Sequence, residues 1–291
     1  MDDFLGGADT YHVYSSEVAA TTTLLKESTA TADTARALTE LISEQAQMAG
    51  WAAFDAGLQT QARKHYLDGL SAAKEAQNLE LAGNSLAFLA YQMVSTQRSG
   101  VDTAQASYET AGQNSAPRVR ALLSERLAWA HAVSGNTQEA DRALGKAAEH
   151  LATDSSAPAP DWVFWVDERE IQIMSGRCWT ELRRPLRAVP LLRSALAGFS
   201  DTHARDKAMY STWLARALID AGEIEQAVDV VHHAADLSDG VASVRPAIHI
   251  ATVMTRLEKY RTTPAVHELF DRVGSTNNHG PASTERSNHS R

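Results

Sequence analysis

The sequence has little of what several classes of protein require. Only one of its 291 residues is cysteine, Cys178, so neither an intramolecular disulfide nor a multi-cysteine metal cluster can form. No run of about 18 apolar residues occurs, which excludes a transmembrane helix. The first residues contain neither a basic stretch nor an apolar core, so they do not resemble a signal peptide. These absences predict a protein of the reducing cytoplasm that does not enter a membrane.

Basic residues are also scarce. The chain has 27 Lys and Arg against 36 Asp and Glu, a net charge of −9. Proteins that bind duplex nucleic acid usually carry a basic footprint, so direct nucleic-acid binding by this chain is not expected. The charge is uneven, because residues 177–216 hold eight basic and three acidic side chains. This stretch is either a solvated helix surface or a binding surface for an acidic partner or anionic ligand.

Motifs of the common enzyme classes are missing. There is no Gly-x-Ser-x-Gly elbow, no His-Glu-x-x-His pair and no glycine-rich phosphate loop. The histidines are scattered, and the adjacent His232 and His233 would point to different sides of a helix. Asp167 and Glu170 could share a helix face for acid–base work, but solvated charge is the simpler interpretation. We therefore predict no enzymatic activity, no metal site and no cofactor.

What the sequence does contain is an internal repeat. In each unit a small residue that ends one helix is followed after five residues by alanine. A large apolar residue comes four positions later, and another small residue three positions after that. Complete copies are Gly57, Ala62, Tyr66, Gly69; Gly135, Ala140, Leu144, Ala147; and Gly222, Ala227, Val231, Ala234. Two partial copies contain Ala104, Tyr108, Ala111 and Ala188, Leu192, Ala195.

This pattern predicts stacked helical hairpins. Glycine ends the first helix of a pair, where a left-handed backbone is needed. Small residues permit close helix approach, and the large residue fills the space between neighbouring pairs. Because a single hairpin cannot bury its apolar face, neighbours must stack. The period resembles that of the tetratricopeptide repeat, with insertions. The predicted fold is all-α, a tetratricopeptide-like α-solenoid of about five helical hairpins with N- and C-terminal capping helices.

The predicted organisation has four parts. Residues 1–43 form a helical cap and the start of the first repeat helix, and residues 44–240 form the repeats. Residues 241–273 form capping helices near 244–260 and 264–273, and residues 274–291 form a disordered tail. Asp33 is expected to cap a helix that runs to about Ala56. Residues 153–160 read as a loop between the third and fourth repeats.

Solenoids bind partners along a concave surface lined by the first helix of each pair. In tetratricopeptide geometry, the residue after the small position of that helix points into the groove. The second repeat fits this register only with about two extra residues near 95–100. The predicted groove residues are Trp51, Tyr91, Trp129, Arg177 and Arg216, with Glu44, Gln47, Asn84, Glu125, Arg126, Glu170 and Trp213 as neighbours.

Aromatic rings and guanidinium groups suit an extended peptide with an acidic end or a free carboxylate. Other interpretations stay open. Tryptophans at helical spacing are also typical of a core, and Arg177 and Arg216 could pair with Glu181 and Asp220, four residues on. Trp162, Trp165 and Trp179 are expected to pack the preceding loop onto the repeats. Cys178 is expected to be a buried structural thiol, because no activating base lies nearby in the sequence.

Five segments in order resemble a known family. They are residues 4–11 (FLGGADTY), 44–51 (EQAQMAGW), 117–123 (PRVRALL), 177–182 (RCWTEL) and 203–208 (HARDKA). Together, over about residues 1–273, they resemble the tetratricopeptide-like C-terminal region of actinobacterial Cro/repressor-type (XRE-family) helix-turn-helix transcriptional regulators. Such regulators usually carry a DNA-binding domain before this region, whereas this chain begins with the region itself.

The resemblance implies a sensing or interaction role linked to transcription. The leading hypothesis is a module that binds a peptide or protein segment in its groove, with self-association as a further possibility. A second hypothesis is a small-molecule sensor with its ligand enclosed by the superhelix. A third is a DNA-binding regulator that acts with a separate or missing helix-turn-helix domain. The family supplies no ligand residues, so the groove residues follow from the repeat pattern alone.

Overall fold

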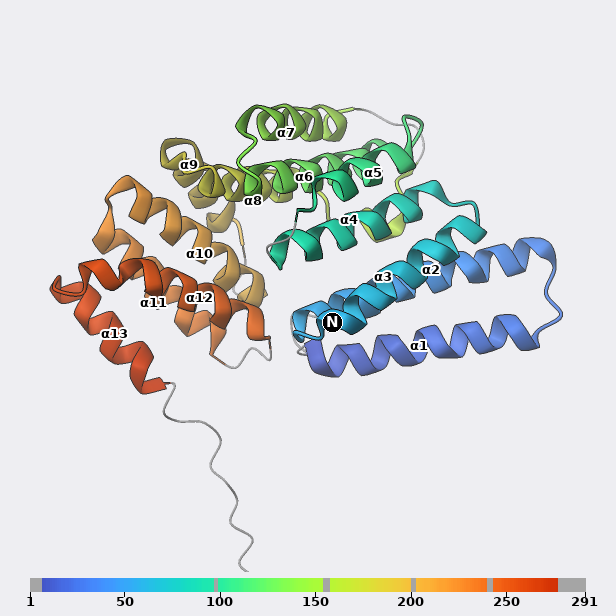
Figure 1. The fold of residues 1–291 in the computed structure, drawn as a ribbon, viewed down its shortest axis with the longest axis horizontal. Helices are drawn as coiled ribbons and strands as arrows, with labels where there is room; N and C mark the ends of the chain where they lie inside the picture. Colours follow the sequence, from blue (N-terminus) through green and yellow to red (C-terminus); the bar gives the residue numbers. More distant parts are fainter. Residues whose placement is uncertain (1–6, 97–98, 154–157, 200–202, 240–242, 277–291) are drawn as a thin grey trace, which may run out of the picture.

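The chain folds entirely into helices and connecting loops where it is described (Figure 1). The computed structural model describes residues 7–96, 99–153, 158–199, 203–239 and 243–276, and no β-strand occurs among them. The thirteen α-helices are α1 (Gly7–Glu27), α2 (Ala32–Asp55), α3 (Gln59–Glu75), α4 (Leu79–Ser95), α5 (Val101–Ala111), α6 (Pro117–Val133), α7 (Thr137–Leu151), α8 (Glu168–Glu181), α9 (Pro185–Ala197), α10 (Ala204–Ala221), α11 (Ile224–Ser238), α12 (Val244–Leu257) and α13 (Pro264–Thr276). Two short 3-10 helices are η1 (Asp161–Val163) and η3 (Glu258–Tyr260). The all-α prediction is confirmed.

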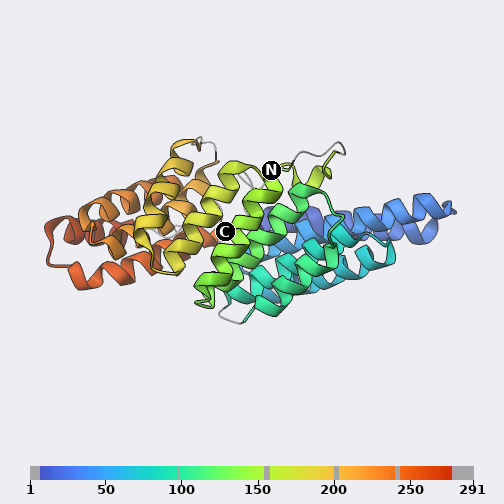
Figure 2. The same cartoon turned by 90° about the horizontal axis from the view of Figure 1, so that it is seen from above.

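Consecutive helices pack as pairs. Helix α2 packs against α3, α4 against α5, α6 against α7, α8 against α9, and α10 against α11. The first helices of these five pairs, α2, α4, α6, α8 and α10, also contact one another in sequence, and α12 follows by packing against α10. We call these six helices the first-helix layer. Seen from above, the helices follow one another from α1 at the blue end towards α13 at the red end (Figure 2).

Glycines end three helices of the first-helix layer, as the repeat predicts. Gly57, Gly135 and Gly222 have φ angles of 79°, 78° and 85° after α2, α6 and α10. A side chain at such an angle is strained, so glycine is favoured there. After α8 the same backbone conformation falls on Arg183, at 54°. The fourth repeat therefore has arginine at the position where three other repeats have glycine.

Small residues allow the paired helices to approach closely. A methyl group added at Gly176 would lie 2.5 Å from Leu192 Cγ, and one added at Gly50 would lie 2.6 Å from Tyr66 Cδ1. Both neighbours are buried large residues of the following helix, sixteen positions along the chain. The close approach expected of the small repeat positions is therefore present in two of the hairpins.

Several predicted boundaries need correction. Thr31, not Asp33, caps α2, because its side-chain oxygen accepts a hydrogen bond from the Thr34 N–H. Asp33 lies in the first turn, where its charge favours the positive end of the helix dipole. At the other end, α12 with η3 and α13 confirm the two capping helices, but α13 continues to Thr276. Residues 277–291 of the predicted tail and 154–157 of the predicted loop lie outside the described residues.

No described helix is both long enough and apolar enough to span a membrane.

Candidate functional site

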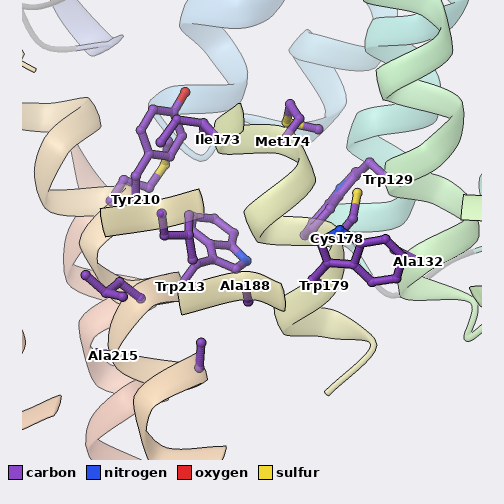
Figure 3. Packing of buried hydrophobic residues seen from close by; sticks show 14 of the residues in the cluster. Trp129, Ala132, Ile173, Met174, Cys178, Trp179, Ala188, Tyr210, Trp213 and Ala215 are labelled. Atoms are coloured by element: carbon purple, nitrogen blue, oxygen red, sulfur yellow. The ribbon is translucent and has the colours of Figure 1, made fainter. Parts of the chain in front are cut away.

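Four of the predicted groove residues meet in one cluster, part of which is drawn in Figure 3. The guanidinium carbon of Arg177 on α8 lies 4.5 Å from the ring centre of Trp129 on α6 and 4.3 Å from that of Trp213 on α10. One Arg177 nitrogen donates a hydrogen bond of 2.8 Å to the hydroxyl of Tyr91 on α4. Tyr91 comes from the second repeat, whose predicted register needed about two extra residues. In the structure it lies beside the other groove residues of this cluster.

These four side chains are buried by one another. Arg177 and Trp213 are each 2% exposed, and Trp129 and Tyr91 are each 6% exposed. The four side chains come from α4, α6, α8 and α10 and fill the space between these helices. The cluster therefore has the packing of a core, which was the alternative interpretation of the tryptophans. A binding role for these residues stays a prediction.

A buried ion-pair cluster joins the two ends of the first-helix layer. Asp55, the last residue of α2, has its Oδ1 3.5 Å from Arg245 Nη1 at the start of α12. Its Oδ2 lies 3.9 Å from Arg205 Nη1 at the start of α10. Arg245 also donates a hydrogen bond of 3.2 Å to the Tyr91 hydroxyl. We call Asp55, Arg205 and Arg245 the closing cluster, because its members come from opposite ends of the repeats.

The closing cluster and Arg177 set the electrostatics around Tyr91. Burial alone would raise the pKa of the Tyr91 hydroxyl, but Arg177, Arg245 and Arg126 outweigh that effect and leave the pKa below its usual value. Nearby, burial raises the pKa of Glu125 well above its ordinary value, despite the charge of Arg126. Burial also raises the pKa of Glu170. The surroundings of Tyr91 thus combine several guanidinium groups with two carboxyl groups whose pKa is raised by burial.

His249 on α12 gives a test of this packing. Burial lowers its pKa to about 3, with help from the charges of Arg245, Arg177 and Arg216. The unfolded chain binds a proton here below about pH 6.5, whereas the folded protein does not until far lower pH. Stability should therefore fall as pH drops below about 6.5, by up to about 1.4 kcal/mol per pH unit from this group. His249→Phe keeps a ring against Trp213 but cannot bind the proton. We therefore expect the unfolding free energy of this variant to fall less steeply with decreasing pH than that of the wild type.

The measurement is the urea unfolding free energy of both proteins at several pH values between neutral and mildly acidic. Other titrating groups, including Glu125 and Glu170, are common to both proteins and cancel in the difference. Equal pH slopes for the wild type and His249→Phe would contradict the assignment.

Two further predicted groove residues have other partners. Trp51 packs against the rings of Phe88 and Tyr91, with the Arg245 guanidinium carbon 4.9 Å from its ring centre. Arg216 forms an ion pair. The Arg216 guanidinium donates two hydrogen bonds, of 2.6 and 2.8 Å, to the Glu181 carboxylate. The alternative pairing of Arg216 with Asp220 is not formed, since Asp220 contacts Arg256 of α12 instead. The expected pairing of Arg177 with Glu181 is likewise replaced by the bond to Tyr91. The helices cross so that partners on neighbouring helices are nearer than partners one turn away.

Polar residues at the start of the layer form another network. Asn84 on α4 donates a hydrogen bond of 2.6 Å to the Gln47 side chain on α2, and Gln47 donates to the Leu81 carbonyl at 3.2 Å. Glu44 is partly buried, and its pKa is raised by that burial and by the charges of Glu40 and Asp161. Asp161 belongs to η1.

The postulated acid–base pair is not formed. Asp167 is the N-cap of α8, and its carboxylate accepts the Glu170 N–H at 2.9 Å. The Glu170 carboxylate instead lies 3.8 Å from Arg126. Cys178 is buried, as predicted, and burial raises its pKa, which disfavours the reactive thiolate. Among the residues that the structure describes, no three His, Cys, Asp or Glu side chains are grouped to hold a metal.

The segment 160–166, between α7 and α8, was not predicted as a site. Val163 and Val166 are fully buried in a cluster that contains Ala87 of α4 and Leu122 of α6. Arg118 donates a hydrogen bond of 3.3 Å to the Phe164 carbonyl. Two apolar anchors and one cation therefore fix this segment across α4 and α6.

Two aromatic side chains of the same segment point outward. Phe164 is 75% exposed and Trp165 is 37% exposed. The Trp165 ring centre lies 5.7 Å from the Arg126 guanidinium, and its N–H donates to the Trp162 carbonyl at 3.0 Å. Trp162 packs against the buried cluster, as expected for loop attachment, but Trp179 lies apart from it, buried under Arg187. The three tryptophans therefore do not form one cluster.

No protein-family model matches the chain, and no curated protein is significantly similar to it.

Proposed function

We propose that this protein is a non-enzymatic interaction module that binds a protein or peptide segment at its outward aromatic pair, Phe164 and Trp165. The observation that carries this proposal is the exposure of these two side chains on a backbone held by fully buried Val163 and Val166. Exposed aromatics on a rigid support are typical of the residues that dominate protein interfaces, because they bury large area at low entropy cost.

The charge beside this pair indicates what the partner offers. Arg126 stacks near Trp165, and Arg118 binds the segment's backbone from α6. Arg126 already lies near Glu125 and Glu170, so the partly exposed Arg118 is the guanidinium group open to a partner. A guanidinium group beside aromatic rings favours a partner segment with an aromatic or aliphatic side chain and a neighbouring carboxylate. This is the same peptide chemistry that the repeat pattern predicts, at a different place on the molecule.

The architecture in which we place this surface is a tetratricopeptide-like solenoid. The repeated pairing of helices, the glycine turns and the close contacts at Gly50 and Gly176 support it. The resemblance to the repeat region of Cro/repressor-type regulators supports a partner connected with transcription. We accordingly propose a regulatory adaptor that responds by binding a polypeptide, with no catalytic step of its own.

The test is affinity capture from native lysate, with bound proteins quantified by mass spectrometry. Phe164→Ala removes the most exposed ring without touching the backbone bond to Arg118, so it should leave the fold intact. A matched control is Leu186→Ala on α9, because Leu186 is also apolar and is 89% exposed. We expect a protein that the wild type and Leu186→Ala capture and that Phe164→Ala captures at least tenfold less, the loss typical of an interface hot spot of ~1.4 kcal/mol or more.

Equal capture by all three proteins would remove this surface from consideration. Loss of capture by both variants would show that exposed apolar side chains in general, rather than the aromatic pair, hold the captured protein.

A further inference from the structure

A cavity of about 110 Å³ lies between α5, α6 and α7, apart from the aromatic pair and from the closing cluster. Its walls combine apolar and polar side chains from all three helices. Leu127 of α6 and Ala143 of α7 form apolar wall, and Ser124 of α6 adds a hydroxyl group. This mixture is typical of small-molecule sites, in which a few polar groups orient a ligand within an apolar enclosure.

The Ser124 hydroxyl of this cavity is buried and has no hydrogen-bond partner among the described residues. The residue is 1% exposed. A buried hydroxyl without a partner is costly, and most such groups in proteins are satisfied by protein, water or ligand. Because Ser124 lines the cavity, it can donate to or accept from a molecule placed there.

Cationic side chains border the same cavity. Lys146 and Arg142 both come from α7, and Glu139 one turn earlier contacts Arg142. Lys146 lies over the Tyr108 ring, with its nitrogen 5.8 Å from the ring centre, and no described carboxylate forms an ion pair with it. One carboxylate therefore faces two cations, so the cavity has a net positive charge and one ammonium group available for a ligand.

We propose that this cavity binds a small organic anion, a monocarboxylate that also carries a hydroxyl or keto oxygen. Its carboxylate binds Lys146, its second oxygen binds Ser124, and its short carbon chain contacts Leu127 and Ala143. The volume limits the size, because an engineered cavity of ~150 Å³ encloses the six heavy atoms of benzene, so the smaller cavity here takes a ligand of at most about six heavy atoms. A metal ion would find only one carboxylate in the cavity, and a peptide segment would not fit.

The experiment is a titration of the full-length, isotope-labelled protein, followed by amide NMR shifts, with lactate, propionate and lactamide as probes. Lactate has both oxygens of the proposed ligand, propionate lacks the hydroxyl, and lactamide lacks the charge. We expect saturable shifts in α5, α6 and α7 with lactate at roughly millimolar concentration, the affinity that a ligand of this size reaches with a few polar contacts. Propionate should bind more weakly, and lactamide more weakly still.

Two variants locate the site. Lys146→Gln removes the ammonium group, and Ser124→Ala removes the hydroxyl at almost constant volume. Each should weaken lactate binding by about tenfold, the effect of losing one charge-assisted or buried hydrogen bond. The control Lys74→Gln changes the same charge at an exposed lysine of α3 and should leave binding unchanged.

A lack of saturable shifts with lactate and propionate would overturn the proposal. So would binding that is equally strong in the wild type and both cavity variants, or lactamide binding as tight as lactate binding. Phe164 does not line the cavity, so the two proposals can fail separately. Capture of a protein partner can fail while lactate binds, and lactate binding can fail while a protein partner is captured.

Discussion

Asp55→Ala is expected to destabilise the protein by about 3–5 kcal/mol, the usual cost of removing one partner from a buried ion pair. The Asp55 side chain is 2% exposed and lies between the guanidinium groups of Arg245 and Arg205, which are each 8% exposed. Without the carboxylate, two buried positive charges face each other. Arg205 retains a contact with Asp206 at 3.2 Å, whereas Arg245 pairs with no second carboxylate among the described residues.

The measurement is the free energy of unfolding by urea, with Asp33→Ala as the control. Asp33 also pairs with an arginine, Arg36, but its side chain is 93% exposed, so its loss should cost less than about 1 kcal/mol. A second variant, Asp55→Ala with Arg245→Met, removes both charges of the closer pair and should recover part of the loss. Similar small effects for Asp55→Ala and Asp33→Ala would show that the closing cluster contributes nothing to stability.

The same variant tests the shape of the molecule. The closing cluster joins α2 to α10 and α12, so its loss removes a contact between the two ends of the first-helix layer. We expect the radius of gyration from small-angle X-ray scattering to rise for Asp55→Ala under conditions where it remains helical. An unchanged radius would mean that contacts between neighbouring helix pairs alone hold the arrangement of the helices.

The helices and their turns could be predicted from the sequence because their causes are local. Gly57, Gly135 and Gly222 each mark a helix end through their own backbone preference, and the sixteen-residue spacing from Gly176 to Leu192 is set within one hairpin. Where the local signal was absent, the prediction was weaker. Arg183 adopts the left-handed conformation although it is not a glycine, and its residue type does not predict this conformation.

The cluster of groove residues could be predicted only in part, because its formation depends on contacts between distant helices. The repeat register brings Tyr91, Trp129, Arg177 and Trp213 to one face, and the structure places them together. Whether that face is open depends on how the successive helix pairs are oriented relative to one another, which no single pair encodes. The contact of Asp55 with Arg245 spans 190 positions, so sequence spacing gave no indication of it.

The segment 160–166 illustrates the same limit. Its tryptophans indicated attachment to the repeats, and Trp162 does pack there. The outward direction of Phe164 follows from the 3-10 turn at Asp161–Val163, which aligns Val163 and Val166 inward. A three-residue turn with no side-chain cap leaves no pattern comparable to an amphipathic helix, so the exposed pair emerges only from the folded chain.

Gly176→Val is expected to destabilise the protein by about 3 kcal/mol, since overpacking a rigid core costs about 1–3 kcal/mol and sometimes more. The first added carbon would lie 2.5 Å from Leu192 Cγ and 2.7 Å from Leu192 Cδ2, and Leu192 is fully buried. Leu192 therefore cannot swing into solvent, and α8 and α9 must move apart.

A matched substitution separates packing from helix propensity. Gly145 also lies within a helix, α7, but a carbon added there meets no atom within 4 Å. Gly145→Val should therefore change stability by less than about 0.5 kcal/mol, and in the stabilising direction, because valine has the higher helix propensity. Adding Leu192→Ala to Gly176→Val opens the space that valine needs, so the double variant should be more stable than the two separate losses predict. Strictly additive losses, or equal effects at Gly145 and Gly176, would mean that glycine at 176 is not required by the approach of α9.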